Sequence, residues 1–349
     1  MWTIRSYLNT DTPALSKIWA LHCQSFHPNP TTQPAHNHPG NSLYPPPQRD
    51  SHCRDLQLRS LECKPAVWDA CIFSKPYFNA DELLLAIDEN GESLGFIHFG
   101  VVPVRTNQER SSIGCIHRLC VNPSPIEADI ASDLIKQALE GLRAQGAKAC
   151  QSLGCGEDST FYLGIAEGDN SMGILGQDQR SQDWFHRAGF APVCPTECWE
   201  LELASFRPPM DRMQIQVRRN CTIGRMLEED YDDWLESTIL GHCEQLRFHL
   251  MVKSPPALAG ILSCWFPDPE VADVDGGIVR IKLPEIPMSE IDQERFVYLL
   301  SESLRQLQQD RKRIVRVVAS AQKQQTITLL QRLGFRSMMN GLIFEKQLS

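Results

Sequence analysis

The pattern of apolar and polar positions predicts alternating strands and helices at the start of the chain. Residues 4–7 suit a short strand, and residues 12–23 carry apolar side chains at helical spacing. Two apolar runs, 83–87 and 94–101, flank an Asn-Gly pair, which is typical of a tight hairpin. A further apolar run predicts a strand over residues 113–121.

A long amphipathic helix is predicted next, over residues 125–145. Its apolar side chains recur every four residues, and Gly146 follows as a stop signal. The pattern then predicts a strand at 149–153, a glycine-rich loop up to Gly176 and a short helix at 181–188. The helix ends at Gly189-Phe190.

The second part of the chain repeats the end of this plan. A Pro-rich break over residues 206–212 separates two runs, 198–203 and 214–217, that we interpret as strands. We place a domain boundary there and predict an N-terminal domain of residues 1–205 and a C-terminal domain of residues 206–349. Further elements are predicted in the second domain: strands at 278–283 and 314–319, and helices at 289–309 and 324–333.

Composition narrows the class of protein. The chain has 349 residues and a net charge of -9, which argues against nucleic acid or an anionic membrane as the main partner. No apolar run reaches the roughly 18 residues that a membrane span needs. The 13 cysteines are scattered without a CxxC pair, and the N-terminus lacks a signal-peptide pattern. We therefore expect reduced thiols and a cytoplasmic location.

A proline-rich and histidine-rich segment interrupts the first domain. We interpret residues 27–66, with seven prolines between positions 28 and 47, as an exposed loop insertion. Histidines and cysteines in and beside it could bind a metal, but their spacing is irregular, so we expect solvated loop side chains and no metal site. The set is His22, Cys23, His27, His36, His38, His52 and Cys53.

The order of elements, together with three sequence motifs, resembles a tandem of two GNAT-type acyltransferase domains. The motifs are Phe73-Ser74-Lys75-Pro76-Tyr77-Phe78, Leu119-Cys120-Val121-Asn122-Pro123 and Phe185-His186-Arg187-Ala188-Gly189-Phe190, and Leu330-Gln331-Arg332-Leu333-Gly334-Phe335 matches the last of them in the second half. The resemblance implies an α/β fold, in which each domain has a mixed, mostly antiparallel central sheet flanked by helices.

The same resemblance implies acyl-coenzyme A as cosubstrate, with acetyl as the default group and a small amine or a peptide amino group as acceptor. The backbone of Leu119, Cys120 and Val121 would hold the pantetheine arm. The turn with Ile130, Ala131 and Ser132 would meet the pyrophosphate, because the N-terminus of a helix attracts anions.

The phosphate turn departs from the family pattern in both halves. Where the family has Arg-Gly-x-Gly-x-Gly/Ala, this sequence reads Ile126-Glu127-Ala128-Asp129-Ile130-Ala131. Carboxylates there stabilise the helix dipole and repel a phosphate. Residues 285–292 contain no glycine, and Ser289 with Asp292 suits a helix cap. We therefore expect the second domain to have lost the cofactor and the first to bind it weakly.

The family's usual proton donor, a tyrosine, is replaced by Phe185 and Leu330. Tyr162 could take its place, although an aromatic anchor under a glycine-rich loop is the structural alternative. His117, on a strand and by alternation on the same face as Leu119 and Val121, has the chemistry of a general base. A partly buried strand histidine is its structural alternative, and His98 on the neighbouring strand carries the same two interpretations.

Two functions stay open from the sequence. One is an acyl-CoA-dependent N-acyltransferase that works chiefly by positioning the reactants, with Gly164, Gly168, Gly173 and Gly176 shaping the acceptor site. The other is a catalytically inactive GNAT-like module that binds a ligand or packs two domains together. The two halves would pair within a monomer as separate subunits do, or the chain would form a homodimer.

Overall fold

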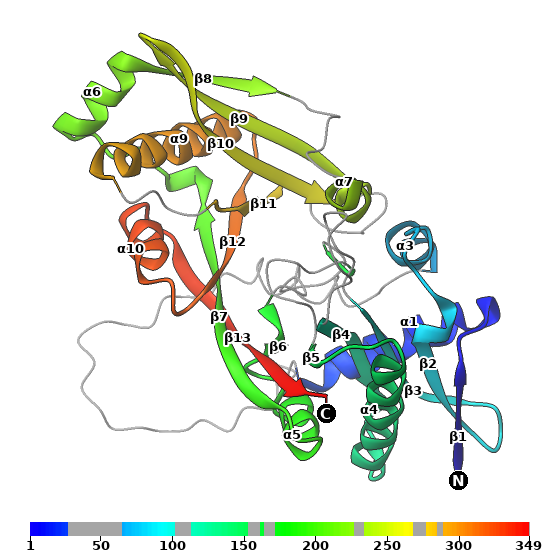
Figure 1. The fold of residues 1–349 in the computed structure, drawn as a ribbon. Helices are drawn as coiled ribbons and strands as arrows, with labels where there is room; N and C mark the ends of the chain where they lie inside the picture. The colour runs from blue at the N-terminus through cyan, green and yellow to red at the C-terminus, as the bar shows by residue number, and fades with distance from the viewer. Residues whose placement is uncertain are drawn as a thin grey trace.

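The computed structural model describes residues 1–26, 65–101, 113–152, 161–163, 172–226, 234–267, 277–284 and 289–348. These residues form one sheet of thirteen strands with helices on both faces. Most neighbouring strands are antiparallel, and the parallel pairs are β4 with β5 and β11 with β12. Figure 1 shows the first half of the chain at one end of this sheet and the second half at the other.

The first half follows the predicted order closely. The strand at 113–121 has the bounds that the apolar pattern indicates, and the long helix begins at Glu127. Its elements are β1 (Trp2–Ser6), α1 (Thr12–Phe26), α3 (Pro65–Trp68) continued by a π-helical turn (Asp69–Phe73), β2 (Leu83–Asp88), β3 (Ser93–Val101), β4 (Ile113–Val121), α4 (Glu127–Ala144), β5 (Ala149–Ser152), β6 (Ile174–Leu175), α5 (Gln179–Arg187) and β7 (Ala191–Glu202).

The second half contains one segment that the sequence analysis assigned wrongly. Residues 214–217, predicted as a strand, lie in helix α6 (Arg212–Asn220), because Asp211 accepts a hydrogen bond from the Gln214 backbone and caps the helix. The remaining elements are β8 (Cys221–Met226), α7 (Trp234–Leu240), β9 (Cys243–Lys253), β10 (Pro256–Pro267), β11 (Ile278–Lys282), α9 (Glu290–Gln309), β12 (Ile314–Ser320), α10 (Gln324–Arg332) and β13 (Arg336–Gln347).

The final strands of the two halves are exchanged. The strand order runs β1-β2-β3-β4-β5-β13-β7-β12-β11-β10-β9-β8, so β13 lies between β5 and β7. β13 therefore completes the sheet of the first half, while β7 pairs with β12 of the second half. In Figure 1, β13 (red) runs beside β7 (green) through the middle of the molecule, and the C-terminus lies in the first half.

Separate apolar cores cover the two faces of the first half. Helix α4 packs its Leu134 and Leu142 against one face of β3 and β4, whereas α1 and the 65–73 segment pack Trp19 and Trp68 against the other. A larger core in the second half lies around α9. The ten cysteines in the described ranges carry free thiols, and no helix there has the length and apolar character to cross a bilayer.

Candidate functional site

The parallel strands β4 and β5 pair only over a short distance. Their register runs from Ile113 opposite Ala149 to Ile116 opposite Ser152, where β5 ends. β4 continues to Val121, and in the described part of the chain no strand pairs with that stretch on the side away from β3. The backbone of residues 117–121 therefore offers an edge along which an extended ligand can make strand-like hydrogen bonds.

An irregularity in β4 changes where His117 points. His98 pairs with Arg118 but Phe99 pairs with Ile116, so His117 is the extra residue of a β-bulge. The sequence prediction that His117 shares a face with Leu119 and Val121 is wrong for this reason. The Leu119 and Val121 side chains pack in the core under α4. The His117 ring lies on the opposite face, with its centroid 5.0 Å from that of the His98 ring.

The bulge brings four side chains together where β4 and β5 part. The Tyr162 hydroxyl and the His98 Nδ1 atom share a hydrogen bond of 2.9 Å. The Phe161 ring packs against both histidines, with centroid distances of 4.5 Å to His98 and 4.8 Å to His117. All four side chains are buried. The structure thus unites His117 and Tyr162, which the sequence named separately, with His98.

Burial fixes the charge state of this cluster. It lowers the pKa of His117 to about 3, and it lowers the pKa of His98 well below the ordinary value, with His117 adding to the effect. Both rings are therefore neutral at physiological pH. The His98 Nε2 atom is buried without a hydrogen-bond partner among the described residues, which is an uncommon state for a polar atom.

Tyr162 adopts an unusual backbone conformation. Its φ angle is +65°, in the left-handed region that side-chain-bearing residues adopt rarely. Such strain costs of the order of 1 kcal/mol or more, and it persists where the surroundings hold it in place. Here the surroundings are Trp19 and Trp68, whose ring centroids lie 5.6 and 5.9 Å from that of Tyr162. The hydroxyl is thereby held toward His98.

Helix α7 of the second half is hydrogen-bonded to residues beside the cluster. Lys75 donates to the carbonyls of Thr238 and Ile239 at the end of α7, and its Nζ lies 3.3 Å from His242 Nδ1. His242 Nε2 donates to the Leu163 carbonyl at 2.8 Å. Burial lowers the pKa of Lys75 and also lowers that of His242, to about 4. These bonds join the end of α7 and the following turn to Lys75 and Leu163.

The residues predicted to hold a cofactor are mostly buried. Leu119, Cys120, Val121, Ile130 and Ala131 have exposed fractions of 1% or less, whereas Ser132 is exposed. Burial raises the pKa of the Cys120 thiol to about 12, so this thiol is unreactive. The predicted contact with a pantetheine arm involves only the backbone of residues 119–121, so the burial of their side chains does not bear on it.

The beginning of α4 fits a pyrophosphate less well. Arg180 of α5 pairs with Glu127 at 2.8 Å and also donates to Ser25 of α1, so the chain's own side chains lie at this end of the helix. Glu127 and Asp129 stand in the first turn. Beside them, His22 Nε2 lies 3.5 Å from Asp178 Oδ2. Burial raises the pKa of Asp178, but the interaction with His22 outweighs this effect and holds that pKa below its usual range. Sequence reasoning missed Arg180 and Asp178, since only the fold brings α1, α4 and α5 together.

The second half has a cavity at the corresponding place. It has a volume of about 420 Å³ and lies where β11 and β12 diverge, at the start of α10. Lys282 and Lys323 are the charged side chains among its lining residues, and Ala319 and Thr326 are buried. Residues 285–288, on which the predicted loss of the cofactor depends, lie outside the described ranges. Most of the predicted metal candidates, as well as Gly164 and Gly168, lie outside them too. No cluster of metal-binding side chains occurs within the ranges.

Comparison with solved structures identifies the fold. The chain matches a GCN5-related N-acetyltransferase from Sphaerobacter thermophilus with a TM-score of 0.58 at 12% identity, over 99% of this chain and 96% of that one. It also matches a tandem GNAT protein from the clavulanic acid biosynthesis pathway with a TM-score of 0.57 at 11% identity, over 100% and 99% of the two chains. The chain has a tandem GNAT fold.

A third match extends this result. The tandem GNAT fold superimposes with a TM-score of 0.65, at 13% identity, on a GCN5-related glucosamine N-acetyltransferase region of a fungal multi-domain β-N-acetylglucosaminidase. The match covers 99% of this chain but only 38% of that one. No protein-family model and no curated protein matches the sequence. The predicted fold class, two GNAT-like halves with a mostly antiparallel mixed sheet, is confirmed.

Proposed function

We propose that the chain is an acyl-CoA-dependent N-acyltransferase that uses acetyl-CoA and acts on a small amine or a peptide amino group. The observation that carries this proposal is the Tyr162–His98 hydrogen bond beside His117, at the point where β4 and β5 part. A polar group held in a strained conformation within a dry aromatic cluster is typical of a catalytic site. The tandem GNAT fold supports the same conclusion.

In this proposal the chain's own groups position the reactants. Bound acyl-CoA supplies a thioester, which is already activated toward amines. The backbone of residues 119–121 would orient the arm that carries it. The neutral amine attacks the thioester carbonyl and the carbon–sulfur bond breaks, while the Tyr162 hydroxyl donates its proton to the leaving sulfur. The proton that the amine nitrogen loses then returns to the Tyr162 oxygen. His98 Nδ1 holds the hydroxyl in place. With a pKa of about 3, His117 is a weak base, so we assign it to hydrogen-bond the neutral amine rather than to carry away its proton.

A second function follows from the geometry at the start of α4. Arg180, Glu127 and Ser25 satisfy one another where a pyrophosphate would bind, which favours an inactive GNAT-like binding module. Calorimetric titration with acetyl-CoA and with free CoA separates the two. Binding at micromolar strength, about -8 kcal/mol, supports the enzyme. The absence of heat at millimolar cofactor would favour the inactive module.

The catalytic assignment is tested by removing one hydroxyl group. We expect Tyr162→Phe to lower kcat by about a hundredfold in an acetyl-transfer assay, because a positioned proton donor contributes 10²–10⁴. Tyr7→Phe is the matched control, since Tyr7 is also buried and its hydroxyl shares a 2.8 Å hydrogen bond with Thr12. Equal rates for the two variants, with acetyl-CoA bound, would remove Tyr162 from the mechanism.

The cellular setting belongs to the same proposal. We place the protein in the cytoplasm, and the free thiols support this placement because an oxidising compartment would favour disulfides. Of the two predicted assemblies, the exchange of β7 and β13 within one chain supports a monomer whose halves pair with each other. Sedimentation measurements at several concentrations distinguish this monomer from a homodimer.

A further inference from the structure

A series of hydrogen bonds passes from the first half of the chain to the second and back to the first. Lys75 Nζ donates to the carbonyls of Thr238 and Ile239 at the end of α7. It also lies 3.3 Å from Nδ1 of His242. The other ring nitrogen, Nε2, lies 2.8 Å from the Leu163 carbonyl oxygen. Lys75 and Leu163 belong to the first half, whereas the imidazole between them belongs to the second.

The partners of this imidazole fix which of its nitrogens carries the proton. Lys75 faces three acceptors, which matches the three N–H groups of an ammonium, and an ammonium only donates. A carbonyl oxygen only accepts, so His242 accepts at Nδ1 and donates from Nε2. Burial and the Lys75 charge lower the pKa of His242 to about 4. The neutral ring therefore donates to Leu163 at physiological pH.

The Leu163 carbonyl directly follows the strained residue of the proposed catalytic cluster. Tyr162 has a φ angle of +65°, and its hydroxyl shares a 2.9 Å hydrogen bond with His98. A conformation of this kind persists only where the surroundings hold it. Two tryptophan rings pack against the tyrosine ring. The bond from His242 acts on the backbone instead, one residue further along the chain.

Apolar contacts join the same segment to the second half. Leu163 and Tyr77 pack against a small apolar core of that half. Its buried members are Leu235, Ile239, Leu240 and Trp265. The Tyr77 ring also contacts the Phe161 ring, at a centroid distance of 5.0 Å. Leu163 is thus held to the second half by its side chain as well as by its carbonyl group.

We propose that His242 is a positioning residue for the Tyr162 hydroxyl, on which it acts through the Leu163 carbonyl. The consequence for catalysis rests on the proposed function, whereas the consequence for the conformation of Tyr162 does not. Lys75 acts one step further away, because it fixes the tautomer of His242. The second half of the tandem therefore takes part in the reaction of the first by holding residues 161–163 in place.

Two variants of nearly equal size separate the contacts of the two ring nitrogens. The amide of an asparagine lies at about the position of Nδ1, so His242→Asn keeps an acceptor for Lys75 and loses the donor to Leu163. The amide of a glutamine reaches about as far as Nε2, so His242→Gln keeps that donor. Both substitutions leave a polar side chain at this half-buried position.

The first test follows Tyr162 by 19F NMR in the full chain labelled with 3-fluorotyrosine, without substrate. Tyr162→Phe assigns its resonance among those of the six tyrosines. We expect His242→Asn to shift this resonance, because the tyrosine loses the backbone contact that holds it. His242→Gln should keep the resonance near its wild-type position. An unchanged resonance in His242→Asn, or equal shifts in the two variants, would overturn the inference.

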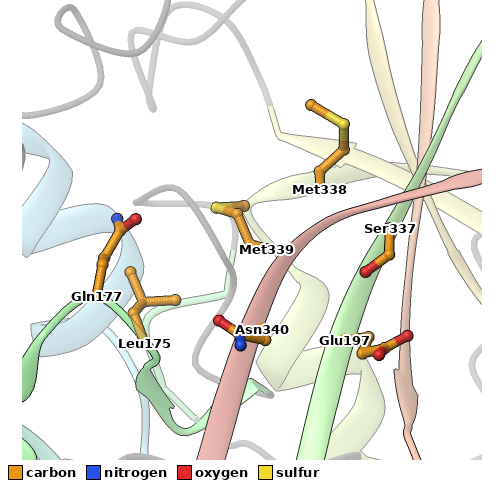
Figure 2. A pocket seen from close by; sticks show the side chains of 7 residues that line it. All are labelled: Leu175, Gln177, Glu197, Ser337, Met338, Met339 and Asn340. Carbon is orange, nitrogen blue, oxygen red and sulfur yellow. The ribbon is translucent and has the colours of Figure 1, made fainter. Parts of the chain in front are cut away.

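A second junction between the halves supplies the control. Figure 2 shows a surface depression that Asn340 of β13 lines together with Leu175 and Gln177 of the first half. Asn340 is exposed, and its side chain lies outside the series of hydrogen bonds through His242. Asn340→Ala should therefore leave the Tyr162 resonance unchanged. A shift equal to that of His242→Asn would show a general response to changes between the halves and would overturn the specific role of His242.

The second test measures acetyl transfer. His242→Asn should lower kcat about tenfold and leave the KM for acetyl-CoA unchanged, because misplacing a reacting group slows the chemical step. In a Tyr162→Phe background the same substitution should cause no further loss, since it acts through the missing hydroxyl. An equal loss in that background would contradict the inference.

The two tests also separate this inference from the proposed function. A 19F shift in His242→Asn, in a chain that transfers no acetyl group, would contradict the proposed acyltransferase alone. Transfer that depends on Tyr162 but is the same in His242→Asn and the wild type would contradict the role of His242 alone.

Discussion

Burial governs the protonation states of single residues in the proposed catalytic cluster. His98 and His117 are neutral because the aromatic rings around them exclude water, and the pKa values of both lie far below the ordinary value. This state suits a site that must present hydrogen-bonding nitrogens to a neutral amine. It also makes folding sensitive to acid, because the unfolded chain exposes the same imidazoles to solvent.

The sign of this sensitivity is fixed by the pKa shift. Between pH 6.5 and about 3 the unfolded state binds a proton at His117 that the folded state does not, so stability falls as the pH falls. From pH 7 to pH 5 this histidine alone accounts for about 2 kcal/mol. We expect His117→Phe to remove that part of the pH dependence in urea unfolding experiments. His186→Phe, at an exposed position, is the control and should keep the wild-type slope.

The prediction for the face of His117 failed because strict alternation does not account for a β-bulge. Strict alternation placed it with Leu119 and Val121, and one bulged residue reversed that placement. A bulge depends on the register of two paired strands, and the sequence of one strand contains no record of it. The pairing of Tyr162 with His98 was likewise invisible, since 64 residues separate the two side chains along the chain.

At the scale of elements, the beginning of α4 is where the proposed acyl-CoA site meets acidic side chains. Its first turn carries Glu127 and Asp129, and Arg180 of α5 neutralises only the first of them. The helix dipole attracts phosphate while the remaining carboxylate repels it. In the proposed donor site of the first half, Asp129 therefore opposes phosphate binding. Among the described residues it forms no ion pair that its removal would break.

The opposing effects of the helix dipole and Asp129 give a prediction about acetyl-CoA affinity. The same measurement shows which half of the chain binds acetyl-CoA. Asp129→Asn should tighten acetyl-CoA binding about threefold at low salt, because a charge near a helix end is worth 0.3–1 kcal/mol. The effect should disappear in high salt. Glu290→Gln makes the same change at the start of α9, the corresponding helix of the second half. If calorimetry shows tighter binding for Glu290→Gln instead, the donor binds in the second half.

Most elements were predictable because their periodicity is local. The strand at 113–121 and the helix that Ser289 caps follow from apolar spacing and capping residues. Residues 214–217 were assigned wrongly because four residues cannot distinguish the two periods, and the cap at Asp211 outweighed them. Of the strands in the second half, β8, β9, β10 and β13 were not predicted.

At the scale of the whole molecule, the exchange of β7 and β13 joins the halves into one sheet. Lys75 adds a second connection, since its buried ammonium donates to α7 of the other half. Both connections cross the boundary that we predict after residue 205. The boundary predicted from the sequence therefore does not separate two independent sheets, because β13 belongs to the second half of the sequence but pairs with β5 of the first.

Splitting the chain tests this arrangement. A fragment of residues 1–205 lacks β13, so β5 loses its partner on one side, and we expect this fragment to aggregate when expressed alone. Co-expressed with residues 206–349, it should form a 1:1 complex on size-exclusion chromatography. A soluble, folded and monomeric 1–205 fragment with the acetyl-CoA affinity of the full chain would contradict the importance of the exchange.

The sequence by itself determined the order and type of most elements, the two-part plan and its resemblance to tandem GNAT proteins, because periodicity, caps and turns act over a few neighbouring residues. Only the tertiary structure decided which half completes which sheet and how the bulge turns His117 toward His98. These depend on pairing between segments far apart in the chain. Such pairing is selected by packing of the whole molecule and not by local preference.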